Sequence, residues 1–74
     1  MIEKIKIVYC VAWNYKPRAV GLAAKIKDEF GFDSELVPGD KGIFDVYAPD
    51  GKLIFSKYSV GRFPETEDIF EKLQ

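Results

Sequence analysis

The chain has no histidine and only one cysteine, Cys10, among its 74 residues. Without histidine, the usual zinc sites and the Cys-His and Ser-His-Asp nucleophile systems are excluded, and one cysteine cannot form an internal disulfide. The spacing of Asp33, Glu35 and Asp45 fits no acid-base pair or metal site. Chemistry in this chain is therefore expected to come from Cys10, and no metal is expected.

An excess of charge of either sign is also missing, because 11 basic side chains face 12 acidic ones and the formal net charge is −1. No segment collects a basic stripe, so nucleic acid is not an expected partner. The opening run MIEKIKIVYC mixes charges into a short apolar stretch, unlike a signal peptide or a membrane span. We expect a cytoplasmic protein with no membrane partner.

The sequence does contain enough apolar residues, 47% of the total, to form one small core. Residues 1–74 are therefore expected to form a single domain. Alternation of apolar and polar residues predicts strands, and apolar spacings of three and four predict helices. The expected elements are a strand over residues 2–9, a helix over 16–30, a strand over 32–37, strands over 42–47 and 52–57, and a final helix over 64–74.

Pro17 fits the first turn of the first helix and Gly31 its left-handed end. The strand, helix and strand at the N-terminal end predict a right-handed parallel unit, and the turn APDGK predicts an antiparallel hairpin. The βαβββα order predicts an α/β thioredoxin-like two-layer sandwich, with a four-stranded mixed sheet and two helices. In its core, Phe44 and Val46 are expected to face Leu53 and Phe55. The last helix is expected to bury three residues, Ile69, Phe70 and Leu73.

Cys10 lies where a strand ends and a helix is about to begin. The positive end of a helix dipole lowers a thiol pKa from about 8.5 to a range of about 3.5–7.5, which favours an exposed, reactive thiolate. Lys16, Arg18 and Lys41 are the cations expected nearest to it, where they would stabilise a thiolate or a glutathione carboxylate. The alternatives are a small buried apolar side chain at position 10 and an ordinary solvated charged face.

Trp13 stands three residues after Cys10, where a dithiol enzyme has its second cysteine. In a Cys-x-x-Cys pair the second thiolate attacks the mixed disulfide that the first has formed, and an indole cannot do this. Trp13 is therefore interpreted either as a lid or partner contact, or as a residue that simply packs against Tyr15.

The run VYCVAWNYKPRAVGLAAKIKDEF resembles the selenoprotein W family, and so do LVPGDKGIFDVY, GKLIFSK and GRFPETEDIFEKL in the same order. The resemblance implies a thioredoxin-like fold and a redox-active centre of the Cys-x-x-selenocysteine or Cys-x-x-Cys type. Cys10 matches the first redox cysteine, and Trp13 occupies the position of the selenocysteine or second cysteine. Tyr15, Lys16 and Pro17 match the family's helix start.

The resemblance implies a thiol redox protein that acts through Cys10 and forms mixed disulfides with glutathione or a partner protein. No cofactor is expected beyond glutathione as a co-substrate. Because UGA encodes selenocysteine and can also be read as tryptophan when the insertion machinery is missing, residue 13 is natively either tryptophan or selenocysteine. The alternative function is a non-catalytic binding module that grips a partner with the loop around Trp13 and the segment Gly61–Pro64, which includes Arg62 and Phe63.

Overall fold

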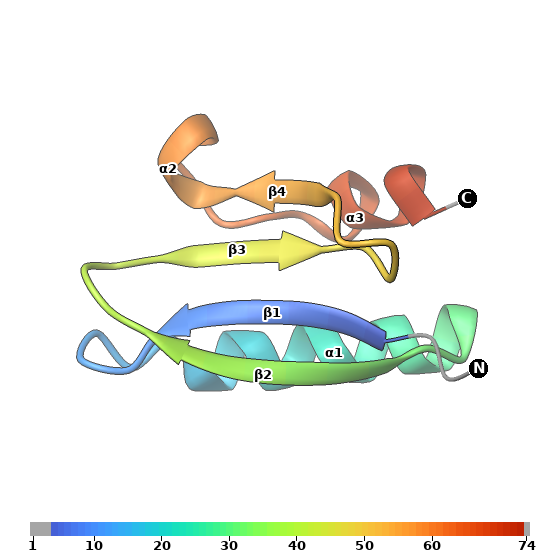
Figure 1. The fold of residues 1–74 in the computed structure, drawn as a ribbon, viewed down its shortest axis with the longest axis horizontal. Helices are drawn as coiled ribbons and strands as arrows, with labels where there is room; N and C mark the ends of the chain where they lie inside the picture. Colours follow the sequence, from blue (N-terminus) through green and yellow to red (C-terminus); the bar gives the residue numbers. More distant parts are fainter. Residues whose placement is uncertain (1–3, 74) are drawn as a thin grey trace.

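A computed structural model describes residues 4–73 of the chain. The strand order in the sheet is β2-β1-β3-β4, with β1 parallel to β2 and the other neighbours antiparallel (Figure 1). The mixed four-stranded sheet is the one expected. Its elements in chain order are β1 (Lys4–Cys10), α1 (Lys16–Phe30), β2 (Asp33–Gly39), β3 (Phe44–Tyr47), β4 (Leu53–Ser56), α2 (Lys57–Val60) and α3 (Thr66–Leu73).

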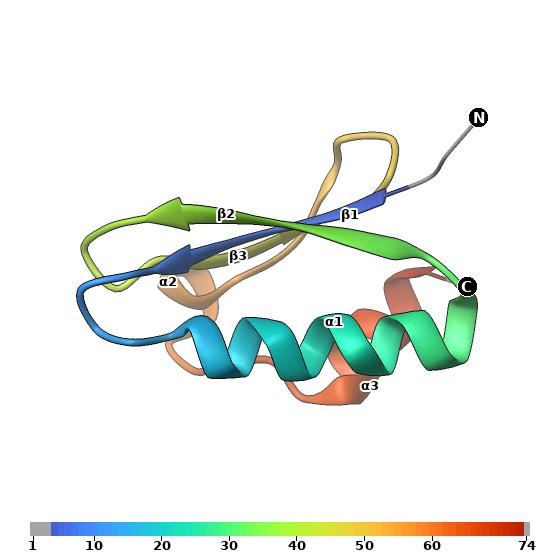
Figure 2. The same ribbon diagram turned by 90° about the horizontal axis from the view of Figure 1, so that it is seen from below.

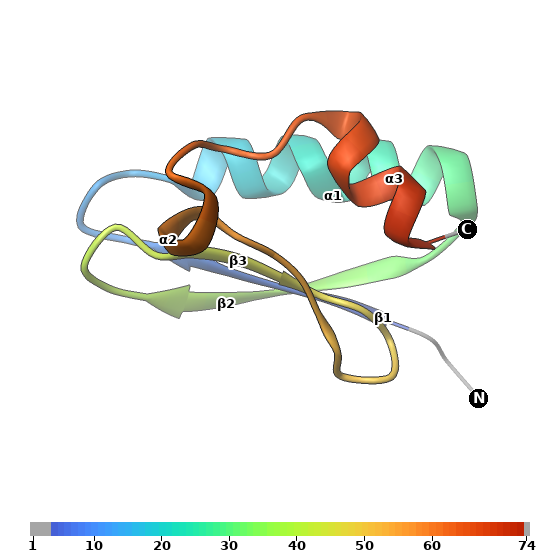
Figure 3. The same cartoon turned by 90° about the horizontal axis from the view of Figure 1, so that it is seen from above.

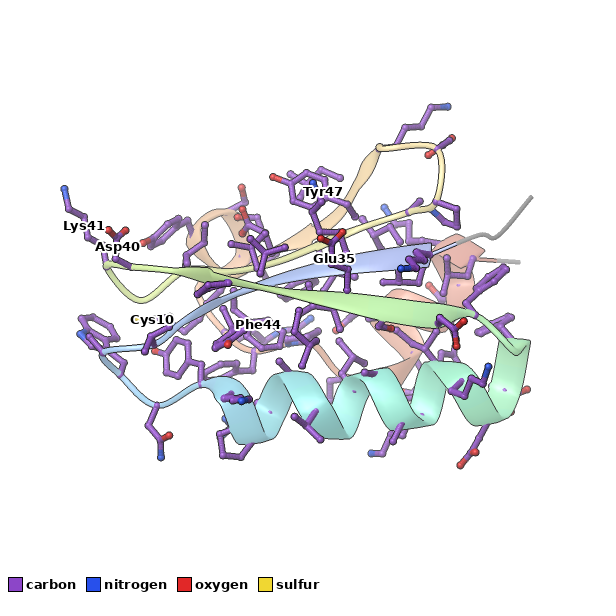
Figure 4. All side chains as sticks on the ribbon, turned by 60° about the horizontal axis from the view of Figure 1, so that its bottom comes forward. Cys10, Glu35, Asp40, Lys41, Phe44 and Tyr47 are labelled. Atoms are coloured by element: carbon purple, nitrogen blue, oxygen red, sulfur yellow. The ribbon has the colours of Figure 1, made fainter. Side chains whose placement is uncertain are left out.

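The helices α1 and α3 cover the same face of the sheet, as Figures 2 and 3 show, so the two-layer arrangement is confirmed. Phe44 points from the sheet towards α1, whereas Glu35 and Tyr47 lie on the other face (Figure 4). The buried core lies between the layers and consists of Ile5, Ile7, Tyr9, Ala19, Leu22, Ile26, Phe44, Val46, Phe55 and Ile69. Phe70 and Leu73 pack against this core, as expected.

The helix α1 has the bounds that its sequence predicts. Pro17 lies in its first turn, and Gly31 ends it with φ 77° while its N–H donates to the Lys27 carbonyl oxygen. Glycine adopts this left-handed conformation without the steric cost that a Cβ brings. The strand β1 runs one residue beyond the expected end, through Cys10, and residues 2 and 3 of the expected strand lie outside the described part of the chain.

The hairpin of β3 and β4 departs from the expected packing at one residue. Val46 pairs with Phe55, but Tyr47 pairs with Leu53, so the register shifts between them. A bulge of this kind turns the residues beyond it to the other face. Phe44, Val46 and Phe55 are buried as expected, whereas the prediction that Leu53 faces inward is wrong, since 51% of Leu53 is exposed.

Residues 4–73 form three helices, one more than the two expected, and the additional helix lies in the last third of the chain. The strand β4 stops at Ser56, and the chain then turns into the short helix α2, which Gly61 ends with φ 86°. The helix α3 begins at Thr66 rather than Pro64, because the Asp68 carboxylate accepts a hydrogen bond from the Glu65 N–H and so fixes the start of the helix there. No helix within residues 4–73 is long and apolar enough to cross a membrane.

Candidate functional site

Cys10 is the last residue of β1 and lies beside Gly39, the last residue of β2. The chain then makes a tight turn in which Asn14, with φ 58°, donates its N–H to the Val11 carbonyl oxygen at 3.0 Å. The Tyr15 N–H returns to the Cys10 carbonyl oxygen at 3.0 Å, and α1 begins at the next residue. The thiol therefore lies between a strand end and a helix start, as the sequence predicts (Figure 4).

The Cys10 side chain is fully buried, and its Sγ accepts a hydrogen bond from the Trp13 N–H at 3.3 Å. The alternative of a buried side chain at position 10 is therefore confirmed, and the expectation of an exposed thiol is wrong. The physical reason is that Cys10 still belongs to the strand, so the turn of residues 11–14 and the neighbouring strand end enclose it.

The Trp13 ring joins two loops at this end of the molecule. It lies over Gly42, where an added Cβ would come within 2.5 Å of the ring, and Gly42 has φ 74°. The ring also packs edge-on against Tyr15, with 6.0 Å between ring centroids, as the packing interpretation predicts. Trp13 is nevertheless 60% exposed, so one face of the indole remains open to a partner.

An aromatic cluster, defined here as Trp13, Tyr15, Phe44 and Phe63, continues from the thiol loop to the face of α1. The Tyr15 and Phe63 ring centroids lie 4.7 Å apart, and those of Phe44 and Phe63 lie 5.4 Å apart. These rings meet edge to face, the arrangement that their quadrupoles prefer. The cluster brings Phe63 of the segment Gly61–Pro64 to the Cys10 loop, although 50 residues separate Phe63 from Trp13.

The structure places the cations that were predicted near the thiol in different parts of the molecule. The Arg18 guanidinium lies over the Phe63 ring at 3.9 Å, next to the aromatic cluster. Lys41 lies at the tip of the loop between β2 and β3 (Figure 4), and Lys16 is exposed at the start of α1. The Arg62 guanidinium pairs with the Asp68 carboxylate at 2.8 Å. Arg62 was predicted for partner contact, and in the structure this ion pair ties it to the first turn of α3.

Two residues near the site, Tyr58 and Lys57, were not predicted from the sequence. Tyr58 of α2 donates its hydroxyl to the Lys41 carbonyl oxygen. Desolvation of that hydroxyl raises the pKa of Tyr58, and the negative charges that Cys10 and Asp45 carry when ionised raise it further. Lys57 lies over the Tyr15 and Phe63 rings. The only sequence signal was an aromatic residue before a turn glycine, which is too common to mark a site.

Asp45 is a buried carboxylate on β3, opposite Val8 of β1 and Ser56 of β4. Its Oδ1 has no hydrogen-bond partner within residues 4–73. From the sequence, Asp45 was one of three carboxylates whose spacing fits no acid-base pair or metal site. Within the described residues, no group of three or more side chains is placed to hold a metal ion.

The fold and the thiol at the end of its first strand define the class of protein: a thioredoxin-like α/β domain whose first strand ends in a cysteine, one turn before the first helix. The chain belongs to the Rdx family, whose model matches residues 4–74. It is 37% identical to selenoprotein W of Ovis aries over 77 aligned positions, which cover 99% of this chain and 87% of that protein. It is also 31% identical to migration and invasion enhancer 1 of Mus musculus, with 95% and 61% covered.

Solved structures agree with this fold. A selenoprotein W-related protein from Vibrio cholerae superposes with a TM-score of 0.87 at 23% identity, over 99% of this chain and 94% of that one. A protein from Bordetella parapertussis gives 0.88 at 27% identity, over 97% and 94%. The resemblance to the selenoprotein W family is therefore confirmed, and family membership supports a thioredoxin-like, redox-related role.

Proposed function

We propose that this protein is a thiol redox protein in which Cys10 forms mixed disulfides with glutathione or with a cysteine of a partner protein. The observation that carries the proposal is the hydrogen bond from the Trp13 N–H to the Cys10 Sγ at 3.3 Å, at a strand end followed by a helix. A backbone donor aimed at the sulfur stabilises the thiolate, which is the form that attacks disulfides.

The reaction begins when the turn of residues 11–14 opens and exposes the sulfur, because the closed turn buries it. The Cys10 thiol loses its proton to solvent, and the thiolate attacks one sulfur of a disulfide. A new S–S bond forms, the old one breaks, and the displaced thiolate leaves with the electron pair. Without a second thiol at position 13, an external thiol must then attack and release Cys10 in reduced form.

The identity of residue 13 gives the proposal two forms, and the gene distinguishes them. A TGA codon with a downstream insertion stem-loop means that the native residue is selenocysteine, which would be the first nucleophile, with Cys10 resolving the selenenyl sulfide. A TGG codon with no downstream insertion stem-loop means that tryptophan is native and that Cys10 works alone. In either form the fold and the sulfur at position 10 are the same.

The experiment that tests the proposal compares three chains in the reduction of a model disulfide by glutathione. We expect the present chain to form a mixed disulfide, Cys10→Ser to form none, and Trp13→Cys to form an internal disulfide and turn over. The geometry allows that disulfide, because residues 10 and 13 flank one tight turn. If Trp13→Cys folds normally but keeps two free thiols under mild oxidation, the loop is not a redox loop.

A second candidate function is the binding module, and exposed apolar residues favour it. Val11, Trp13, Tyr58 and Val60 are each at least half exposed, and they belong to the Cys10 turn and to α2 at the same end of the molecule (Figure 1). Exposed apolar patches mark interaction sites more often than isolated apolar residues do. Partner binding that survives Cys10→Ser and is lost in Trp13→Ala would support this function over the redox one.

A further inference from the structure

A groove of about 190 Å³ lies between α1 and the segment that leads into α3, on the helical side of the sheet. Figures 2 and 3 show this segment running between α2 and α3 on the same side of the sheet as α1. Apolar side chains form its floor and basic ones its rim, and no acidic side chain within residues 4–73 lines it. Its walls include Arg18, Leu22, Lys25, Phe44, Phe63 and Thr66.

The charged side chains that line this groove, Arg18 and Lys25, are both basic. Arg18 and Lys25 are exposed about two turns apart on α1, and Lys57 lies over the Phe63 ring at 5.4 Å. Within residues 4–73, none of these three cations forms an ion pair with a carboxylate. The whole chain has a net charge of −1, so this local positive charge is not a general property of the surface.

Gly21 keeps the helix wall of the groove open. It lies on α1 between Arg18 and Lys25, and a Cβ added to it would meet nothing within 4 Å. Glycine is one of the least favourable residues for the interior of a helix. No crowding requires it here, so its effect in the folded protein is to leave room between the two cations.

The aromatic cluster connects this groove to the thiol. Arg18 contacts Phe63, Phe63 contacts Tyr15, and Tyr15 contacts Trp13, whose N–H bonds the Cys10 sulfur. An extended peptide rises about 3.3 Å per residue. A peptide whose cysteine reacts at Cys10 therefore reaches the groove with the residues about three to six positions away.

We propose that this groove selects partner proteins whose reacting cysteine is flanked by acidic residues, which bind between Arg18 and Lys25. The inference rests on the proposed function of Cys10 and names its substrate class. Unpaired cations beside an apolar floor complement an acidic segment that also carries apolar side chains, and charge complementarity of this kind acts mainly on the rate of association.

The test uses two synthetic peptides that differ only in the flanking residues, glutamates in one and glutamines in the other, each with its cysteine joined to thionitrobenzoate. The Cys10 thiolate attacks the peptide sulfur, a new S–S bond forms, and thionitrobenzoate leaves with the electron pair. Cys10 is thereby oxidised and the probe reduced, while the thiol proton goes to solvent. Absorbance gives the rate, and intact mass confirms the peptide adduct on Cys10.

At about 20 mM salt we expect the glutamate peptide to react about tenfold faster than the glutamine peptide, and at about 500 mM salt we expect nearly equal rates. The double variant Arg18→Gln, Lys25→Gln removes the preference. Gly21→Gln weakens it without changing any charge, because the new side chain occupies the groove. Lys52→Gln removes a cation in the β3–β4 turn and serves as the matched control, which keeps the full preference.

The glutamine peptide also reports in each variant that the fold and the thiol chemistry are intact. Equal rates for the two peptides with the unchanged chain, with the adduct on Cys10, would overturn the inference and leave the proposed function standing. A preference that persists in the double variant would overturn the groove as its source. If neither peptide nor glutathione disulfide modifies folded Cys10, the proposed function falls and the inference with it.

Discussion

At the scale of single residues, Trp13 makes two contacts at the Cys10 turn. Its backbone N–H bonds the sulfur, and its ring ties the turn of residues 11–14 to Gly42 in the neighbouring loop. Truncating the ring leaves the N–H in place but removes the tie. We therefore expect Trp13→Ala to raise the rate of Cys10 alkylation by iodoacetamide in the folded protein at least about fivefold, because the turn opens more often.

The matched control for this variant is Leu53→Ala, which also shortens an exposed apolar side chain but lies in β4 beyond the bulge. Its alkylation rate should equal that of the unchanged chain. A Trp13→Ala rate that is no faster than the Leu53→Ala rate would show that the ring does not hold the turn closed.

Gly42 tests the same contact from the other side. Gly42→Ala places a Cβ against the Trp13 ring at a position with φ 74°, whereas Gly51→Ala meets open space at φ 92°. Both substitutions strain the backbone, so the difference between them isolates the ring contact. We expect Gly42→Ala to lower the free energy of unfolding by about 1–3 kcal/mol more than Gly51→Ala does. Urea denaturation of both variants measures this difference.

At the scale of elements, local sequence signals predicted α1 fully and the hairpin only in part. Pro17 and Gly31 act on their own backbone, so the helix bounds follow from neighbouring residues. The bulge that exposes Leu53 depends on how β4 meets β3, and α2 depends on where the chain leaves the sheet. Neither is encoded in the alternation of apolar residues, which continues through Leu53 and Phe55 as if the strand were regular.

The hairpin register gives a prediction with an internal control. Phe44→Ala empties a buried site, since Phe44 is 1% exposed, and should lower the free energy of unfolding by about 3–5 kcal/mol. Leu53→Ala acts at an exposed position and should change it by less than about 0.5 kcal/mol. Chemical denaturation measures both. A cost for Leu53→Ala comparable to that of Phe44→Ala would place Leu53 in the core and refute the bulge.

The start of α3 gives a prediction about pH. The hydrogen bond from Arg62 lowers the pKa of Asp68, and the Glu65 N–H lowers it further. A carboxyl whose pKa is lower in the folded protein stabilises the fold above its ordinary value of 3.8, and this contribution is lost as the pH falls below that value. Asp68→Asn removes it. Its melting temperature should therefore lie below that of the unchanged chain at about pH 6 and approach it by about pH 3.

The contrary result is a difference in melting temperature that is the same at both pH values, which would mean that the Asp68 carboxylate is not ionically coupled to Arg62. Glu71→Gln is the control, because Glu71 is exposed on the same helix and forms no ion pair within residues 4–73. It should shift the melting temperature little at either pH.

At the scale of the whole molecule, the candidate site is assembled from segments that are distant in sequence. The Cys10 turn, the Gly42 loop, Phe63 and α2 meet at one end of the sheet (Figure 1). The sequence predicted the members that lie near Cys10 and the family-like segment around Phe63. It could not decide between a buried and an exposed Cys10, and it could not predict the contact of Trp13 with Gly42 or of Tyr58 with Lys41, because these depend on how the loops fold together.

The central claim is that Cys10 is a redox thiol which the folded protein exposes by opening its turn. The most direct measurement is intact-mass spectrometry of the folded chain during incubation with glutathione disulfide, with Cys10→Ser as the control. The account predicts that one glutathionyl group adds to Cys10 under native conditions, that Cys10→Ser gains none, and that a reducing thiol removes it. Modification of Cys10 only after denaturation would contradict the account and make the thiol a structural residue of the core.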